Sequence, residues 1–211
     1  LPITPCPAHE EDRLEAHGWS ELLESAMRGE VGTEAAALRI FPTPAMVLID
    51  VDGSLPPAQL GPKGAKLAAQ AIRAMNLTGS IGIDLPTMNN KDERAIAAAQ
   101  IDKILPQPFE RTAVNGFGFV QIIRKRERAS LIELLREDPV RAAAMALLRQ
   151  GERWRSGNAA GGGPVTLSAN PSVTGLIHRN RHWVEMLEKR RGGVVTLAAD
   201  ASLSMESFHA G

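Results

Sequence analysis

The 211-residue sequence has no tyrosine and a single cysteine, Cys6, and aromatic residues make up only 4% of it. One cysteine excludes a disulfide within the chain and a zinc site built from several cysteines. The sequence also lacks an excess of charge: 24 Lys and Arg balance 24 Asp and Glu, so net charge alone indicates no nucleic-acid partner. No apolar run approaches the roughly 18 residues of a membrane span and no signal peptide is visible, so we expect no membrane contact and a cytoplasmic location. Because residue 1 is leucine, we also expect that an N-terminal portion is missing.

Two short apolar runs that each contain an aspartate organise what is present. Residues 45–53 and 79–85 are short, rich in β-branched residues and followed by glycine or proline, which is typical of strands buried on both faces. Residues 62–75 between them carry apolar side chains at helical spacing. A strand, a helix and a second strand form a crossover unit, which predicts that the two strands are parallel.

The carboxyl ends of parallel strands share one edge of a sheet, where ligands bind. Asp50 and Asp84 are therefore expected to lie near each other, with Asp52 just past the first strand. Magnesium prefers oxygen ligands and keeps several waters, so two carboxylates and a substrate phosphate suffice to hold it. The alternative is that both aspartates only close strands at a solvated edge.

The predicted fold class is α/β, with a mixed sheet and a smaller C-terminal α/β unit. Strands are predicted at residues 37–41, 109–114, 117–124, 164–169, 194–199 and 202–209. Helices are predicted at residues 11–28, 91–105, 130–154 (interrupted before Pro139) and 172–191. A turn is expected at 29–33, a type I′ turn at Asn115-Gly116, and a linker at 156–163. The expected domains are an N-terminal helical remnant (1–33), a subdomain that contains the two aspartate strands (34–136), and a helical linker with a small α/β domain (137–211).

A basic run follows the apolar strand at residues 117–124. Its residues Arg124, Lys125 and Arg126 are the candidate RNA-binding residues, because clustered Lys and Arg bind backbone phosphates. We expect the run to hold a single strand beside the metal, with Phe117 and Phe119 as a stacking surface. The alternative is a solvated basic turn with two core phenylalanines.

Three other features carry no catalytic assignment. His178 and His182 have a spacing that can clamp zinc, but the glutamate of the metalloprotease motif is absent and arginines crowd the pair, which favours a surface or packing role. The glycines at 161–163 lack the lysine of a phosphate-binding loop and indicate a linker. Cys6 lies in a proline-rich segment without the surroundings of a reactive thiol.

Three motifs, in the right order, resemble the ribonuclease E/G family. Residues 47–53 (VLIDVDG) look like the first metal-binding motif of the family, and residues 78–85 (TGSIGIDL) resemble the second. Residues 117–126 (FGFVQIIRKR) are similar to the phenylalanine-glycine strand of the family that ends in basic residues. The resemblance covers about residues 34–136 and extends weakly to the unit from Pro164 onward, which looks like the small C-terminal domain of the family.

The resemblance implies endonucleolytic cleavage of single-stranded RNA that depends on magnesium, with manganese as the alternative ion. The two aspartates that hold the metal in the family match Asp50 and Asp84, which would then be catalytic residues. Asp52 stands where the family usually has an asparagine near the scissile phosphate, and it is the third catalytic candidate. The cysteine pair that links subunits through zinc is absent, so a homo-oligomer is left open but not through zinc. The alternative to an enzyme is an RNA-binding module that keeps the fold without efficient cleavage.

Overall fold

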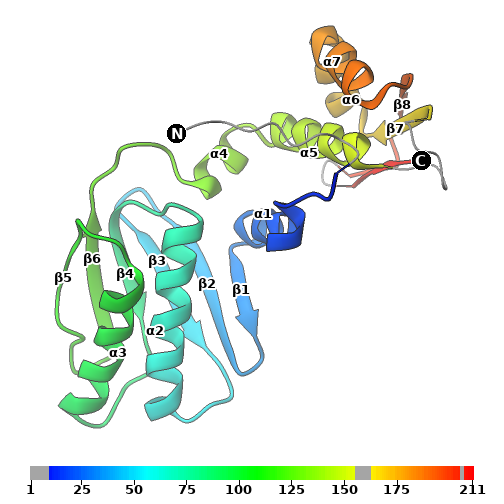
Figure 1. The fold of residues 1–211 in the computed structure, drawn as a ribbon. Coiled ribbons are helices and arrows are strands. Elements are labelled where there is room, and N and C mark those ends of the chain that lie inside the picture. Colours follow the sequence, from blue (N-terminus) through cyan, green and yellow to red (C-terminus); the bar gives the residue numbers. More distant parts are fainter. Residues whose placement is uncertain (1–9, 155–162, 205–206) are drawn as a thin grey trace. The chain divides into compact units, whose positions relative to one another are not determined.

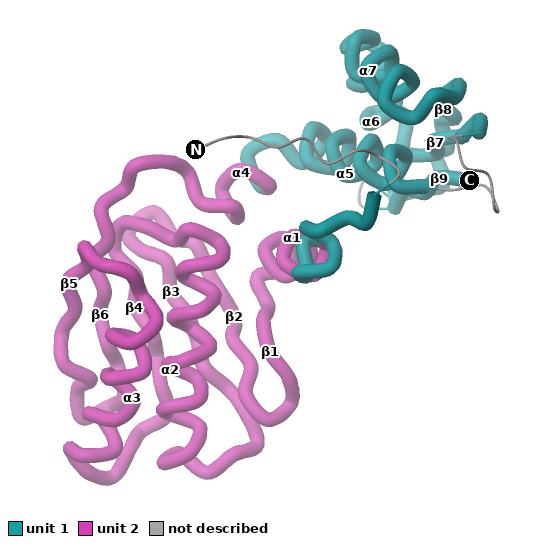
Figure 2. Tube along the Cα trace, viewed as in Figure 1, with its two compact units in different colours: residues 1–19, 136–211 teal, residues 20–135 magenta. Residues whose placement is uncertain are grey.

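The computed structural model describes residues 10–154, 163–204 and 207–211. The chain forms two compact units, shown in two colours in Figure 2. The main unit is Ser20–Leu135, and the terminal unit combines Leu1–Trp19 with Arg136–Gly211. Within the residues described, none of the helices is both long enough and apolar enough to span a bilayer.

The main unit is built on a mixed sheet that has six strands in the described part of the chain, in the order β1-β2-β3-β4-β6-β5. The strands are β1 (Glu30–Thr33), β2 (Ala36–Pro42), β3 (Val47–Asp52), β4 (Gly79–Asp84), β5 (Glu110–Arg111) and β6 (Phe119–Arg124). Strands β3 and β4 are parallel, and the other neighbours are antiparallel. The predicted α/β class and the parallel pair are therefore confirmed.

Two helices cover one face of this sheet, α2 (Pro57–Ala74) and α3 (Lys91–Ile104) (Figure 1). Helix α2 begins five residues earlier than residues 62–75 predicted, so Pro62 lies inside it. Most of its buried residues are glycine or alanine, and a side chain at Gly64 would collide with Val51 of β3. The small residues let the helix lie close to the strands, so the core between helix and sheet is closely packed.

Helix α3 starts with a reciprocal cap. The Asn90 side chain accepts a hydrogen bond from the backbone N–H of Glu93 (2.9 Å), and the Glu93 carboxylate accepts one from the backbone N–H of Asn89 (3.1 Å). Among its isoleucines, Ile101 is fully buried, whereas Ile96 is 54% exposed. The buried side chains of α3 are Ala97, Ala98 and Ile101.

Two local predictions in the main unit were wrong. Residues 30–33 are not part of a turn but form β1, which pairs with β2 as an edge strand. The connection from β5 to β6 is not a type I′ turn, because that turn needs positive φ at both central residues and Gly116 has none. Instead Gly118, with φ 99°, ends a four-residue turn in which its N–H donates to the carbonyl of Asn115 (3.1 Å).

The terminal unit packs helices against a small sheet with the order β8-β7-β9, three strands within the residues described. Its strands are β7 (Val165–Ala169), β8 (Val195–Ala199) and β9 (Phe208–Ala210), and its helices are α5 (Pro139–Arg153), α6 (Pro171–Arg179) and α7 (Arg181–Arg191). The core includes Leu147, Leu167 and Ile177. The remaining elements of the chain are the 3₁₀ turn η1 (Glu15–His17), α1 (Trp19–Arg28) and α4 (Leu131–Glu137).

The predicted helix 130–154 is interrupted before Pro139, as expected, between α4 and α5. The single helix predicted at 172–191 was wrong, because the chain leaves the helical conformation at Asn180 and α6 and α7 are separate. The linker predicted at 156–163 lies outside the described residues except for Gly163, and so does Cys6.

Candidate active site

The candidate carboxylates lie on the sheet face that α2 and α3 leave uncovered. Side chains alternate along β3: Ile49 and Val51 are buried in the core, so Asp50 and Asp52 project from the opposite face. Asp50 of β3 and Asp84 of β4 are direct partners in the parallel register. Neighbouring strands lie about 4.8 Å apart, so the structure brings these two aspartates side by side.

Asp50 is the electrostatic centre of this group. Partial burial raises the pKa of its carboxyl, the negative charge of Asp52 raises it further, Arg39 opposes this, and Asp84 adds a smaller upward contribution. The net effect is a raised pKa of Asp50, so the compensation that Arg39 provides is incomplete. A divalent ion held by Asp50 and Asp84 would supply the remaining positive charge.

Arg39 is the site residue that the sequence patterns missed. It lies on β2, opposite Asp50 in the antiparallel register. Its Nη1 lies 2.6 Å from Oδ2 of Asp52 and 3.7 Å from Oδ2 of Asp50. The available signal was one charged residue inside an apolar strand predicted to pair with the Asp50 strand, but the register was needed to know which aspartate it meets.

Asp52 is held by Arg39 instead of converging with the other two carboxylates. Among the residues that the structure describes, no group of three or more His, Cys, Asp or Glu side chains could hold a metal ion. The donor set is therefore the pair Asp50 and Asp84, both exposed enough to leave room for water. This pair fits magnesium, which is commonly bound by one or two carboxylates, several waters and substrate phosphate.

Aromatic side chains flank the carboxylate pair on the side away from Arg39. Phe119 of β6 is the register partner of Asp84, and its ring lies over Gly82 of β4. A side chain at Gly82 would meet the tip of that ring at 2.6 Å and Leu48 at 3.1 Å, so only glycine leaves room for the ring at this position. Phe117, in the turn before β6, is 82% exposed.

This turn is fixed against the end of β4. The side chain of Asn115 accepts hydrogen bonds from the backbone N–H groups of Phe117 (2.9 Å) and Phe119 (3.0 Å). The N–H of Leu85, the residue after Asp84, donates to the carbonyl of Gly118 at 3.3 Å. A side chain at Gly118 would collide with the carbonyl oxygen of Leu85, so only glycine lets the turn lie this close to the end of β4. The phenylalanines are thus positioned relative to Asp84 by the backbone.

The basic run lies at the other end of the sheet from the aspartates. Strand β6 is antiparallel to β4, so Arg124 is opposite Gly79, five residues along β4 from Asp84. The expectation that the run lies beside the metal site was wrong, because the antiparallel direction carries it away. Arg124 donates to the carbonyl of Leu77 (2.7 Å), and burial lowers the pKa of its guanidinium.

Lys125 and Arg126 remain exposed beyond β6. Lys125 lies 3.8 Å from Glu127, and Arg126 forms an ion pair with Glu133 at 3.0 Å. Both charges are therefore partly neutralised on the protein, although each is still accessible to an RNA phosphate.

His178 and His182 lie on two different helices, α6 and α7, because of the break at Asn180. The ring of His182 is in edge contact with Trp183, with centroids 5.7 Å apart.

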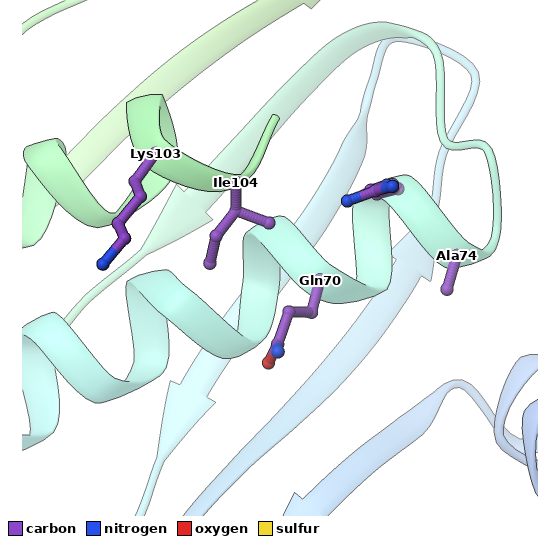
Figure 3. A pocket seen from close by; sticks show the side chains of 5 residues that line it. Gln70, Ala74, Lys103 and Ile104 are labelled. Atoms are coloured by element: carbon purple, nitrogen blue, oxygen red, sulfur yellow. The ribbon is translucent and has the colours of Figure 1, made fainter. Parts of the chain in front are cut away.

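An open pocket of about 350 Å³ lies between α2 and α3, in the helix layer that covers the other face of the sheet. Figure 3 shows its lining residues, Gln70, Arg73, Ala74, Lys103 and Ile104. These residues include no carboxylate, so the pocket is not a second candidate for the metal chemistry.

Comparison with known proteins supports the resemblance in part. No family model matches the chain. A segment of 70 residues, 32% of this chain, is 39% identical to Ribonuclease G of Escherichia coli (strain K12) and covers 14% of that protein. Ribonuclease G of Shigella flexneri matches at the same identity, and that of Salmonella typhimurium (strain SL1344) at 37%. The chain is therefore distantly related to Ribonuclease G, and the match spans 14% of the length of these relatives.

Proposed function

We propose that the protein is a magnesium-dependent endoribonuclease that cleaves single-stranded RNA. The observation that carries the proposal is the pairing of Asp50 with Asp84 in register on adjacent parallel strands. The distant relationship to Ribonuclease G gives the chemistry its substrate class, since the name of that protein denotes action on RNA.

Asp50 and Asp84 would hold the ion through one carboxylate each, with the uncovered sheet face open to the RNA. When bound, magnesium supplies a water of lowered pKa and neutralises charge on the scissile phosphate. Asp50 and Asp84 would fix the position of the ion, whose chemistry would suit in-line attack of water on phosphorus. The bond to the 3′ oxygen would break, and that oxygen would gain the proton that the water loses. The charge of Asp52 is balanced by Arg39.

RNA bases on either side of the cleaved bond have an aromatic surface available. Phe119 lies over Gly82, and Phe117 is exposed in the adjoining turn. Stacking of a base on such a ring is worth about 1–3 kcal/mol and tolerates any sequence. Lys125 and Arg126 would contact phosphates farther along the strand, at the other end of β6, and Arg124 serves chiefly to hold the backbone there.

The test is the substitution Asp84→Asn, which keeps the size of the side chain but removes one anionic ligand. It should abolish magnesium-dependent cleavage of 5′-labelled single-stranded RNA while leaving RNA binding nearly unchanged. Asp92→Asn is the matched control, because Asp92 is an exposed aspartate in the first turn of α3, in the helix layer. Equal cleavage by wild type and Asp84→Asn would contradict the proposed site.

A second candidate function is an RNA-binding module without efficient cleavage. The observation that favours it is the ion pair of Arg39 with Asp52, which places a cation inside the acidic group. The same cleavage experiment separates the two functions. If wild type binds the labelled RNA but cuts none of it with either magnesium or manganese, the binding module replaces the enzyme.

A further inference from the structure

Three aspartates lie together on the uncovered sheet face, and the cation Arg39 is within ion-pair distance of two of them. Asp50 and Asp84 are register partners, and Asp52 follows two residues later on the same face of β3. Among the described residues, the only ion pairs recorded for this group are those of Arg39, at 2.6 Å to Asp52 and 3.7 Å to Asp50. The positive charge that offsets the acidic group thus comes from the protein itself.

The two distances show how the guanidinium is shared. Arg39 is the cross-strand partner of Asp50, so β2 aims it at that carboxylate. Its short contact, however, is the one with Asp52, which draws the guanidinium along the sheet and away from Asp50. The oxygen of Asp50 is therefore within the electrostatic range of Arg39 but outside hydrogen-bonding distance.

We propose that Arg39 is an internal counter-ion that competes with the divalent cation for Asp50, and that Asp52 is a positioning residue that holds Arg39 off the metal site. This inference rests on the proposed function, because it assumes that Asp50 and Asp84 bind the ion. It assigns Asp52 a role through Arg39 instead of a direct bond to the metal. In this arrangement the guanidinium reduces the repulsion among the carboxylates when no metal is bound, and it weakens the affinity of Asp50 and Asp84 for the ion.

The first test measures manganese binding to the full chain, by the loss of the free-ion signal in electron paramagnetic resonance. Arg39→Gln should bind manganese about tenfold more tightly than wild type, because a unit charge within several ångströms of a partly exposed ion changes affinity by about that factor. Arg39→Lys, which retains the charge, should stay within about threefold of wild type. Arg73→Gln removes an equal charge from the helix layer and should bind as wild type does.

The second test is a double-mutant cycle between Arg39 and Asp52 with the same readout. Asp52→Asn releases the guanidinium onto Asp50, so it should weaken manganese binding about tenfold when Arg39 is present. In the Arg39→Gln background the same substitution should cost about threefold or less, since only the distant charge of Asp52 is lost. Thermal unfolding followed by circular dichroism checks that each variant is folded before its affinity is compared.

The outcomes separate this inference from the proposed function. Unchanged affinity in Arg39→Gln, or equal losses from Asp52→Asn in both backgrounds, overturns the role of Arg39, even if Asp84→Asn abolishes manganese binding and so supports the proposed site. Equal losses in the two backgrounds would instead make Asp52 a direct ligand. If Asp84→Asn binds manganese as wild type does, or if neither wild type nor Arg39→Gln binds it, the metal site fails and the inference fails with it.

Discussion

At the scale of single residues, the electrostatic cost of the acidic group is concentrated on Asp50. Burial and then the charge of Asp52 raise its pKa, Arg39 offsets this in part, and Asp84 raises it again. A carboxyl whose pKa is raised on folding is easier to protonate in the folded chain than in the unfolded one. Its neutral form therefore favours folding, and this contribution is lost as pH rises through the raised pKa.

Asp50→Asn should accordingly stabilise the metal-free protein at pH 7, by less than about 1 kcal/mol because the side chain is 42% exposed and water screens its charge. The advantage should shrink as the pH is lowered and vanish below the ordinary aspartate pKa of 3.8. Urea unfolding at a series of pH values, in the presence of EDTA, measures it. A variant less stable than wild type at pH 7 would show that Asp50 contributes a folding contact as an anion.

The pattern of residues predicted that Asp50 and Asp84 lie close together as site residues. Two apolar strands joined by one helix are expected to be parallel, which puts their carboxyl ends at the same edge of the sheet. It did not predict that Arg39 belongs to the site, because that contact depends on the register of β2 and β3. A shift of the register by one residue would move Arg39 to the other face of the sheet. Distance in the sequence also hid the ion pair of Asp12 with Arg149, which are 137 residues apart.

At the scale of elements, β6 has different chemistry at its two ends. Phe119, at its start, is opposite Asp84, whereas Arg124, at its end, is opposite Gly79. The sequence predicted this strand and its basic end but not its direction relative to the aspartates. Antiparallel pairing with β4 separates the basic run from the metal site, and Arg124 is used for backbone hydrogen bonds.

Arg124→Ala should therefore lower the free energy of unfolding of the main unit by about 1–3 kcal/mol, because the partly buried carbonyl of Leu77 loses its charged donor. Lys125→Ala is the matched control and should change stability by less than about 0.5 kcal/mol, as exposed substitutions commonly do. In RNA binding the order should reverse, and Lys125→Ala should reduce the slope of log affinity against log salt by about 0.7 if it contacts one phosphate. Urea unfolding and a salt titration of RNA binding measure the two effects. Equal stability of the two variants would contradict the assignment of Arg124.

The other differences between prediction and structure at this scale arise where propensity alone cannot decide. Residues 172–191 have a nearly continuous helical pattern, yet Asn180 interrupts it by donating its side-chain amide to the carbonyl of Leu176 (2.9 Å). Residues 30–33 look like a turn because of Gly29 and Gly32, but pairing with β2 makes them a strand. In both cases a contact decides the local structure, and a single sequence does not show the contact.

At the scale of the whole molecule, each unit has a hydrophobic core of its own. All three tryptophans, Trp19, Trp154 and Trp183, belong to the terminal unit. Trp154 and Trp183 lie wholly within that unit and Trp19 at its boundary, so tryptophan fluorescence reports mainly the terminal unit, whereas far-ultraviolet circular dichroism reports both. This distribution makes the two units separately observable in the intact chain.

The N-terminal segment is tied into the terminal unit through Asp12. Oδ2 of this side chain lies 2.6 Å from Arg149 and 3.0 Å from Arg153, both on α5, and only 12% of the side chain is exposed. Its other oxygen accepts hydrogen bonds from the backbone N–H groups of Leu14 (3.0 Å) and Glu15 (3.2 Å). Burial raises the pKa of Asp12, but the hydrogen bond from Glu15 and the two arginines outweigh it, so the pKa is lowered. This carboxylate therefore stabilises the unit above its ordinary pKa, and the contribution is lost as pH falls through the lowered value.

Asp12→Asn keeps an oxygen for the two backbone donors and removes only the charge. It should lower the free energy of unfolding of the terminal unit by about 1–3 kcal/mol at pH 7, the usual range for a hydrogen bond to a charged group. The fluorescence midpoint in urea should fall, while the part of the dichroism transition that belongs to the main unit stays in place. Arg124→Ala is the matched variant in the main unit, and it should shift the dichroism transition and leave the fluorescence midpoint unchanged. If each substitution shifts both signals together, the two units unfold as one cooperative body, and the separation into two independently stable cores is wrong.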